Sequence, residues 1–302
     1  MRQAHRDLVR HYLDSLAFPR AKALTLHANL AHIPTHFHDS ELIDAILATG
    51  RAMLPNVVHY IRRNQRDDRR TPDFWVHYLN EHQLDIQNLV SSFKDPSAVV
   101  MEELAVFPLH HIATMILAGR IIGEARAIQV FQYHRHRRSW RWDPNATRQP
   151  DGTFNVSGLT PDRVDEVLIT IELTADFDED AMPANLTEAI TAGRMPWVRI
   201  TTPNPDGNCI RHPNDIDQFM HVARRAINHV QDVMRARRVH LIAISPASTV
   251  FCFGQMLQAG HHPTYTIYDR AGRDTPFNEA FSISGHEVTA SAGTQTTSIP
   301  IR

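Results

Sequence analysis

The sequence has very few cysteines and lysines. Only Cys209 and Cys252 are cysteines among its 302 residues, which excludes a disulfide framework and a zinc ribbon and fits a reducing cytosol. Lysine occurs only at positions 22 and 94, so 29 of the 31 basic residues are arginines. This bias is typical of genome base composition, but a guanidinium group also binds phosphate and stacks on bases.

An excess of charge of one sign and long apolar runs are also missing. The net charge of −2 excludes a chain-wide basic field that would hold long nucleic acids, so any phosphate site must be local. No stretch approaches the roughly 18 apolar residues of a membrane span. The first twenty residues are charged throughout and lack the apolar core of a signal peptide. We therefore expect a cytoplasmic protein with no membrane partner.

Familiar catalytic motifs are absent as well. The sequence has no glycine-rich phosphate loop, no nucleophile elbow and no paired-cysteine motif. Cys252 lies in an apolar run that is typical of a buried side chain. The group His36, His38, Asp39 and Glu41 matches no standard zinc spacing, and we expect no metal and no cofactor. The sequence favours a non-catalytic protein over an enzyme.

What is present is an alternation of strand and helix patterns. Apolar residues alternate at 23–31 as in a strand, form a continuous run typical of a strand at 104–107, and recur at helical spacing at 110–122. After a proline- and glycine-rich segment the same rhythm begins again at 167–175. An α/β fold with largely parallel sheets follows. We predict an N-terminal helix at 1–21, a first half at 22–143, a linker at 144–164 and a second half at 165–302.

The two halves also share a spaced motif. Gly119 precedes Tyr133 by 14 residues and Gly254 precedes Tyr268 by 14, and an arginine follows two positions after each tyrosine. Each block comes after an apolar strand that ends at a proline, Pro108 or Pro246. We infer a tandem pair of Rossmann-like units, each with a largely parallel sheet flanked by helices. A duplication that retains no symmetric ligand remains an alternative.

Candidate ligand residues come from strand ends and from the repeat. Ligands of open α/β sheets lie beyond the carboxyl ends of the strands, where helix N-termini attract anions. Tyrosine, tryptophan and arginine side chains can stack on bases and bind phosphates. The alternatives are helix capping for the hydroxyls, core packing for the aromatics and an exposed surface for the arginines. The candidates are Pro108, His110, Tyr133, Arg135, Trp140, Pro246, Ser248, Thr249, Tyr268 and Arg270. Trp142 shares the alternatives of Trp140.

Three segments carry a family resemblance. FPLHHIATMILAGRIIGEARAIQVFQYHRHRRSWRW at 107–142, VLITIELTA at 167–175 and VHLIAISPASTVFCFGQMLQAGHHPTYTIYDR at 239–270 resemble the SAVED domain family. Those domains are sensors of bacterial anti-phage systems, CBASS and some type III CRISPR systems, built from two fused CARF-like units. The resemblance implies ligand loops directly after the first strand of each half, which adds Asn29, His32, Thr174 and Asp176 to the candidates.

The resemblance also implies a function. It implies that a cyclic oligonucleotide, of the cyclic tri- or tetra-adenylate type, binds in a groove between the halves. Family members often assemble head to tail, and most are fused to an effector. With no such domain before residue 22, we expect self-association or a separately encoded effector, with the N-terminal helix as a docking element. The alternatives are a ring-nuclease-like enzyme that cleaves the same messenger, and a nucleotide-dependent α/β enzyme.

Overall fold

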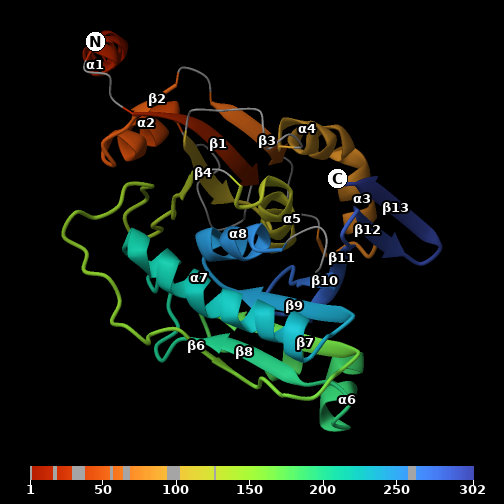
Figure 1. The fold of residues 1–302 in the computed structure, drawn as a ribbon. Helices are drawn as coiled ribbons and strands as arrows, with labels where there is room; N and C mark the ends of the chain where they lie inside the picture. Colours follow the sequence, from red (N-terminus) through yellow and green to blue (C-terminus); the bar gives the residue numbers. More distant parts are fainter. Residues whose placement is uncertain are drawn as a thin grey trace.

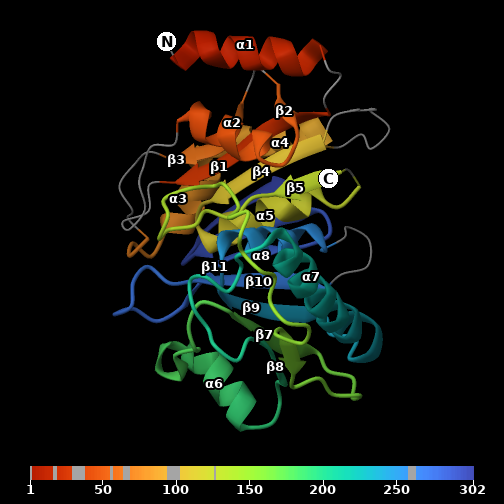
Figure 2. The same cartoon turned by 90° about the vertical axis from the view of Figure 1, so that its left-hand side faces the viewer.

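The structure is a computed structural model that describes residues 2–15, 19–28, 38–54, 57–63, 69–93, 103–125, 127–257 and 263–302. Helix α1 (Arg2–Ser15) forms where the amphipathic pattern predicts it and lies at one end of the molecule (Figure 2). Two of its apolar side chains, Leu8 and Tyr12, are exposed. Within the described residues, no helix is both long enough and apolar enough to span a membrane.

The first sheet is entirely parallel and is built around β1 (Arg20–Ala28). β2 (Ala52–Met53) and β3 (Val58–Arg63) pair with one edge of β1, and β4 (Glu103–Leu109) pairs with the other. β5 (Ile128–Val130) follows β4 at the edge. Parallel neighbours need crossover connections, and helices supply most of them. These helices are α2 (Asp39–Leu47), α3 (Phe74–Glu81), α4 (Gln83–Phe93) and α5 (Ile112–Ile122).

The second sheet has a parallel centre with antiparallel strands at both edges (Figure 1). Its parallel strands are, in spatial order, β8 (Trp197–Thr201), β7 (Glu166–Glu172), β9 (Arg238–Ile244) and β10 (Thr264–Asp269). The antiparallel strands are β6 (Asn155–Ser157), β11 (Asn278–Ile283), β12 (Glu287–Ala292) and β13 (Gln295–Pro300). The helices are a 3-10 turn (Glu179–Ala181), α6 (Ala184–Thr191), α7 (Pro213–Asn228) with a π-helical end (His229–Val233), and α8 (Ala247–Gln255).

The parallel parts of the two sheets have the same strand order. The order β3-β1-β4-β5 in the first sheet corresponds to β8-β7-β9-β10 in the second. β4 and β9 each have seven residues, and two residues separate each strand from its helix, α5 or α8. This confirms the tandem pair of α/β units. One correction concerns the linker, because its residues 155–157 form β6, which pairs with β8.

The two halves pack through a close crossing of α5 and α8, and Figure 1 shows these helices side by side between the sheets. A Cβ atom on Gly119 would overlap the carbonyl oxygen of Phe251, and one on Gly254 would overlap that of Ile116. In both helices the carbonyl belongs to the residue three positions before the glycine, so the contact is reciprocal. The repeated glycines thus allow the backbones to meet, and a continuous apolar core runs through both halves.

Candidate functional site

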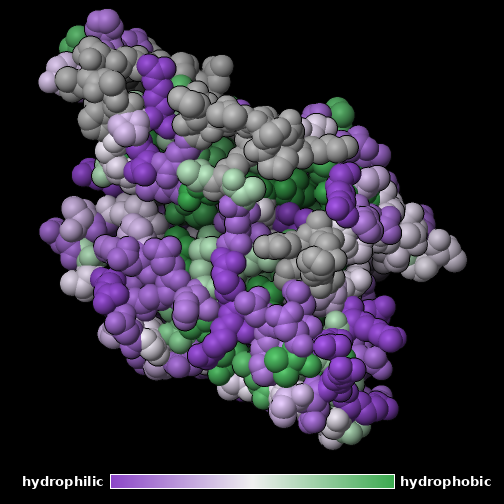
Figure 3. Space-filling view, viewed as in Figure 1, coloured by the Kyte–Doolittle hydropathy of each residue, from purple (hydrophilic) through white to green (hydrophobic). Residues whose placement is uncertain are grey.

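The carboxyl ends of strands from the two halves meet at one place, which we call the junction: Gln132, two residues after β5, and Ser248, in the first turn of α8. The Gln132 Oε1 atom accepts hydrogen bonds from the Ser248 hydroxyl at 2.6 Å and from the Ser248 backbone N–H at 3.3 Å. The sequence did not single out Gln132, because one glutamine after a strand carries no distinctive signal. In Figure 3, hydrophobic surface is visible in the band between the first-half elements and α7.

An ion pair adds a second contact between the ends of the two halves. The Arg69 guanidinium donates to the Asp269 carboxylate at 2.7 Å, and both side chains are largely buried. Arg69 also donates to the carbonyl oxygen of Arg270 at 3.2 Å. Because Arg69 follows β3 and Asp269 ends β10, this pair fixes the first half against the second.

The candidates at the start of α8 are buried. Ser248 and Thr249 are both 0% exposed, and Pro246 is buried before them. The Thr249 hydroxyl donates to the carbonyl oxygen of Pro246 at 2.7 Å and lies 2.7 Å from the Ser245 hydroxyl. The Thr249 hydroxyl satisfies local groups, as in the capping alternative, whereas the Ser248 hydroxyl bonds to Gln132 of the first half. A ligand could reach either hydroxyl only if these bonds opened. Their contact with a ligand stays a prediction.

The corresponding place in the first half needs one correction. Pro108 does not end its strand but lies inside β4, paired with Leu26 of β1. Proline is tolerated there because β5 pairs with β4 only up to Val106, where the Phe131 N–H donates to the Val106 carbonyl, so the missing N–H faces no partner strand. His111, not the proline, precedes α5 as its N-cap residue.

His110 belongs to a buried polar cluster. Its side chain is 3% exposed, and its Nδ1 atom accepts the His111 backbone N–H at 2.8 Å. Its Nε2 atom lies 3.5 Å from the Tyr78 hydroxyl, which accepts a hydrogen bond from the Thr114 hydroxyl at 2.7 Å. The His82 ring contacts the same tyrosine in a tilted arrangement, with ring centroids 4.6 Å apart. The imidazole of His110 therefore faces the protein interior.

The aromatic candidates of the first half pack into the core. Tyr133 and Trp140 are 3% and 1% exposed, with ring centroids 5.2 Å apart. Trp140 also meets Phe107 edge to face at 5.2 Å, and Phe107 stacks on Phe131 at 4.5 Å. Burial raises the pKa of the Tyr133 hydroxyl. Both rings are therefore packed in the core, as the core-packing alternative expects. Arg135, two residues after Tyr133, is exposed.

Tyr268 and Arg270 are already bonded within the second half. Tyr268 is buried with the apolar cluster that includes Leu186 of α6, and its hydroxyl lies 3.0 Å from His240 Nδ1. Burial raises the pKa of that hydroxyl. The Arg270 guanidinium donates to the Asp178 carboxylate at 2.9 Å and to the carbonyl oxygen of Thr275 at 2.5 Å. A ligand phosphate would have to displace these partners.

The tyrosines of the repeat are not equivalent in the sheets. Leu104 and Val239, each the second residue of its strand, pair with Ile128 and Tyr265 respectively. Counting onward from these partners, Tyr133 corresponds to Arg270. Gly119 precedes its paired position, Ile128, by nine residues, whereas Gly254 precedes Tyr265 by eleven, so equal glycine-to-tyrosine spacing places the two tyrosines at different positions in the sheets.

The candidates after the first strands are only partly described. Asn29 and His32 lie outside the described residues. Thr174 is half-buried and Asp176 is exposed, directly after β7. The sequence missed the ion pair beneath them, in which Arg199 donates to the buried Glu172 carboxylate at 2.9 and 2.6 Å. Those hydrogen bonds raise the pKa of Arg199. A polar residue in a strand usually indicates exposure, so the pattern gave no sign of this pair.

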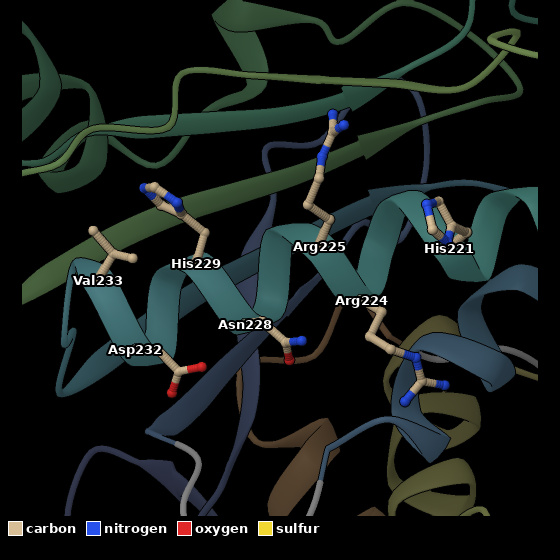
Figure 4. A pocket seen from close by; sticks show the side chains of 7 residues that line it. All are labelled: His221, Arg224, Arg225, Asn228, His229, Asp232 and Val233. Carbon is tan, nitrogen blue, oxygen red and sulfur yellow. The ribbon is translucent and has the colours of Figure 1, made fainter.

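A hollow of about 430 Å³ runs along α7 and its π-helical end. Figure 4 shows that its side chains leave the helix on different sides: Arg225 and His229 point one way, and Arg224 and Asp232 the other. Arg224 is moreover bound to Glu124. The groups do not converge on one ligand, and the hollow contains none of the sequence candidates.

A family model, SAVED (SMODS-associated and fused to various effectors sensor domain), matches residues 88–283, from α4 to the end of β11. No curated protein matches the chain.

Two solved structures are similar in fold. Both are of an Acinetobacter baumannii Cap4 SAVED/CARF-domain containing receptor. The one with the cyclic trinucleotide 2'3'3'-cAAA has 12% identity and a TM-score of 0.53, over 92% of this chain and 55% of that chain. The one with 3'3'3'-cAAA has 13% identity and a TM-score of 0.52, over 91% and 55%. This chain thus spans about half the length of those receptors.

Proposed function

The chain belongs to the SAVED family of sensor domains, and we propose that it is a receptor for a cyclic oligonucleotide that binds at the junction. The observation that carries the proposal is the family match, because its range of 88–283 includes β4, α5, β9 and α8, the elements that bring the halves together. Receptors of the same fold have been solved with cyclic trinucleotides of adenylate, which supports a cyclic tri- or tetra-adenylate as the ligand.

The structure supports a binding role for this junction on physical grounds. Parallel sheets place ligands beyond their carboxyl ends, and here such ends from two similar units lie next to each other at Gln132 and Ser248. A ring with repeated nucleotides fits a receptor with repeated units. His110 faces the interior, so this histidine does not favour cleavage of the ring.

A ligand screen tests the proposal. Calorimetry and thermal denaturation are run with cyclic di-, tri- and tetranucleotides, because a ligand that binds only the native state raises its melting temperature. We expect a cyclic tri- or tetra-adenylate to raise it by several degrees and to be recovered intact by chromatography. If none of the rings changes the melting temperature, the proposed receptor function is contradicted. If a linear product is recovered, the ring-nuclease alternative is favoured.

We further propose that the liganded protein acts by self-association or through a separate effector. Two similar but non-identical halves can form a heterologous contact that propagates. The exposed Leu8 and Tyr12 of α1 support this helix as the docking element. Light scattering with and without the bound ring tests this: a fully liganded protein that remains monomeric excludes self-association and leaves the effector.

A further inference from the structure

A turn rich in arginine projects from the end of β5. An antiparallel bridge joins His134 and Ser139, and the four residues between them, Arg135 to Arg138, are all exposed. Arg138 has φ 50°, in the left-handed region that residues other than glycine seldom adopt. The Arg137 side chain donates to the carbonyl oxygen of Arg141 at 2.9 Å. We call residues 135–141 the arginine turn.

Buried side chains fix the base of this turn. Trp140 and Trp142 are 1% and 9% exposed, and the His134 ring lies 5.1 Å from that of Trp142. The two tryptophans alternate with exposed residues along the chain, so the arginines stay at the surface while the rings enter the core. A site that is fixed before binding loses less conformational entropy when a ligand arrives.

The arginine turn carries positive charge that the protein does not neutralise. Within the part of the chain that the structure describes, Asp143 lies 3.9 Å from Arg137, and no carboxylate pairs with Arg135, Arg138 or Arg141. By contrast, Arg69, Arg199 and Arg270 are held by carboxylates. Burial is the main cause that lowers the pKa of His134 to about 4, and the nearby Arg137 and His136 lower it further.

The arginine turn also lies beside the junction. Arg135 follows Gln132 by three residues, and three residues span at most about 11 Å. Gln132 is the residue that bonds to Ser248 of the second half. Arg135, the arginine closest to Gln132 in the chain, therefore lies near the junction and has no ion-pair partner among the described residues.

We propose that the arginine turn binds the phosphodiester groups of the oligonucleotide held at the junction, through Arg135, Arg138 and Arg141. This inference rests on the proposed function. Because Trp140 and Trp142 are buried, the turn offers charge and hydrogen-bond donors without an exposed tryptophan ring, which favours recognition of phosphate. A net charge of −2 argues against a long nucleic acid as the ligand.

The test compares two triple variants of equal charge. R135Q/R138Q/R141Q removes the three unpaired arginines of the turn, and R163Q/R225Q/R235Q removes three exposed arginines outside the turn, one in the linker and two in the second half. The control is matched in backbone as well, because Arg235 has φ 52° and Arg138 has φ 50°. Calorimetry measures the affinity of each for the cyclic tri- or tetra-adenylate that the wild type binds, at about 50 and about 200 mM salt.

We expect the turn variant to bind the ring at least about tenfold more weakly than the wild type, with a shallower salt dependence, and the control to bind normally. Equal affinity of the turn variant and the wild type overturns the role of the turn and leaves the proposed function intact. A wild type that binds no ring contradicts the proposed function itself. If only the turn variant loses binding of labelled duplex DNA while its ring affinity is unchanged, the turn binds long nucleic acid and this proposal is wrong.

Folding of the variants is checked by circular dichroism and thermal denaturation. Arg135 and Arg138 make no side-chain hydrogen bond to the described residues, so we expect wild-type stability. If the triple variant does not fold, Arg138→Asn replaces it, since asparagine tolerates the left-handed region. Its expected loss of ring affinity is about threefold or more, and an unchanged affinity overturns the proposal.

Discussion

The two halves share a backbone plan but use the polar groups at their strand ends differently. In the second half the Glu172 carboxylate is bonded to Arg199, and Arg270 is bonded to Asp178. In the first half, His27 occupies the position that corresponds to Glu172. His27 pairs with Leu109, the last residue of β4, and Glu172 pairs with Ile244, the last residue of β9. The first half also carries the arginine turn, in which Arg135, Arg138 and Arg141 have no carboxylate partner among the described residues.

This difference shows which part of a duplication is constrained. The crossing of α5 and α8 requires backbone contact, so a glycine occurs at the same place in both helices. Side chains at strand ends do not take part in that contact and have diverged. Under the proposed function, a ring with equivalent nucleotides would therefore meet non-equivalent groups in the two halves. Variants of the shared crossing and of the divergent strand ends test this difference.

Replacing a glycine of the crossing should have the largest effect. In Gly119→Ala or Gly254→Ala the added methyl group overlaps a backbone carbonyl that no side-chain rotation can move away. We expect each to lower the free energy of unfolding by about 3 kcal/mol, measured by urea denaturation. Gly207→Ala is the control, because a Cβ there meets only open space. An unchanged midpoint for both crossing variants would mean that the halves do not touch there.

Breaking the buried ion pair of the second half should have the next largest effect. Glu172→Gln leaves the Arg199 guanidinium without its carboxylate, while the residue keeps its size. Glu172 is buried but Arg199 is partly exposed, so we expect a loss of about 2 kcal/mol in urea denaturation. Glu188→Gln breaks an exposed pair with Arg194 and should change stability by less than about 0.5 kcal/mol. Equal effects of the two variants would contradict the distinction between a buried and an exposed ion pair.

Lowering the pH should destabilise the first half through His134. Its pKa is about 4 in the folded protein and about 6.5 when unfolded, so the unfolded state binds the proton more readily. Stability is therefore lost as the pH falls from about 6.5 towards 4, and we expect a decrease of between about 1 and 2 kcal/mol from pH 7 to pH 5. His134→Asn should reduce this decrease when unfolding is followed at both pH values. His77→Asn, which replaces an exposed histidine, is the matched control.

Tyr268→Phe should have the smallest effect of the four. It removes the hydroxyl that bonds to His240 and should cost about 1 kcal/mol in urea denaturation. Because the Tyr268 ring lies in the cluster under α6, we expect the variant to keep wild-type ring affinity in calorimetry. A clear loss of affinity would show that Tyr268 contributes to ligand binding. The second half would then contribute to the ligand site, as is proposed for the first half.

Periodicity predicted the elements that repeat. The apolar runs at 104–107 and 110–122 correspond to β4 and α5, and their counterparts form β9 and α8. The strands β11 to β13 were not predicted. Their sequence is rich in serine and threonine, and much of its surface is exposed, so its apolar alternation is weak. Equal spacing in sequence also gave the wrong pairing of Tyr133 with Tyr268, because loop lengths shift the sheet register.

The sequence by itself determined the class of fold, the duplication and the resemblance to a sensor family, because these depend on apolar periodicity and on short patterns along the chain. Only the tertiary structure decided which polar groups are available to a ligand. Ser248, Tyr268 and Arg270 are bonded to partners far away in sequence, including Gln132, His240 and Asp178. Whether a side chain is satisfied depends on neighbours that folding brings together, and a one-dimensional pattern does not contain them.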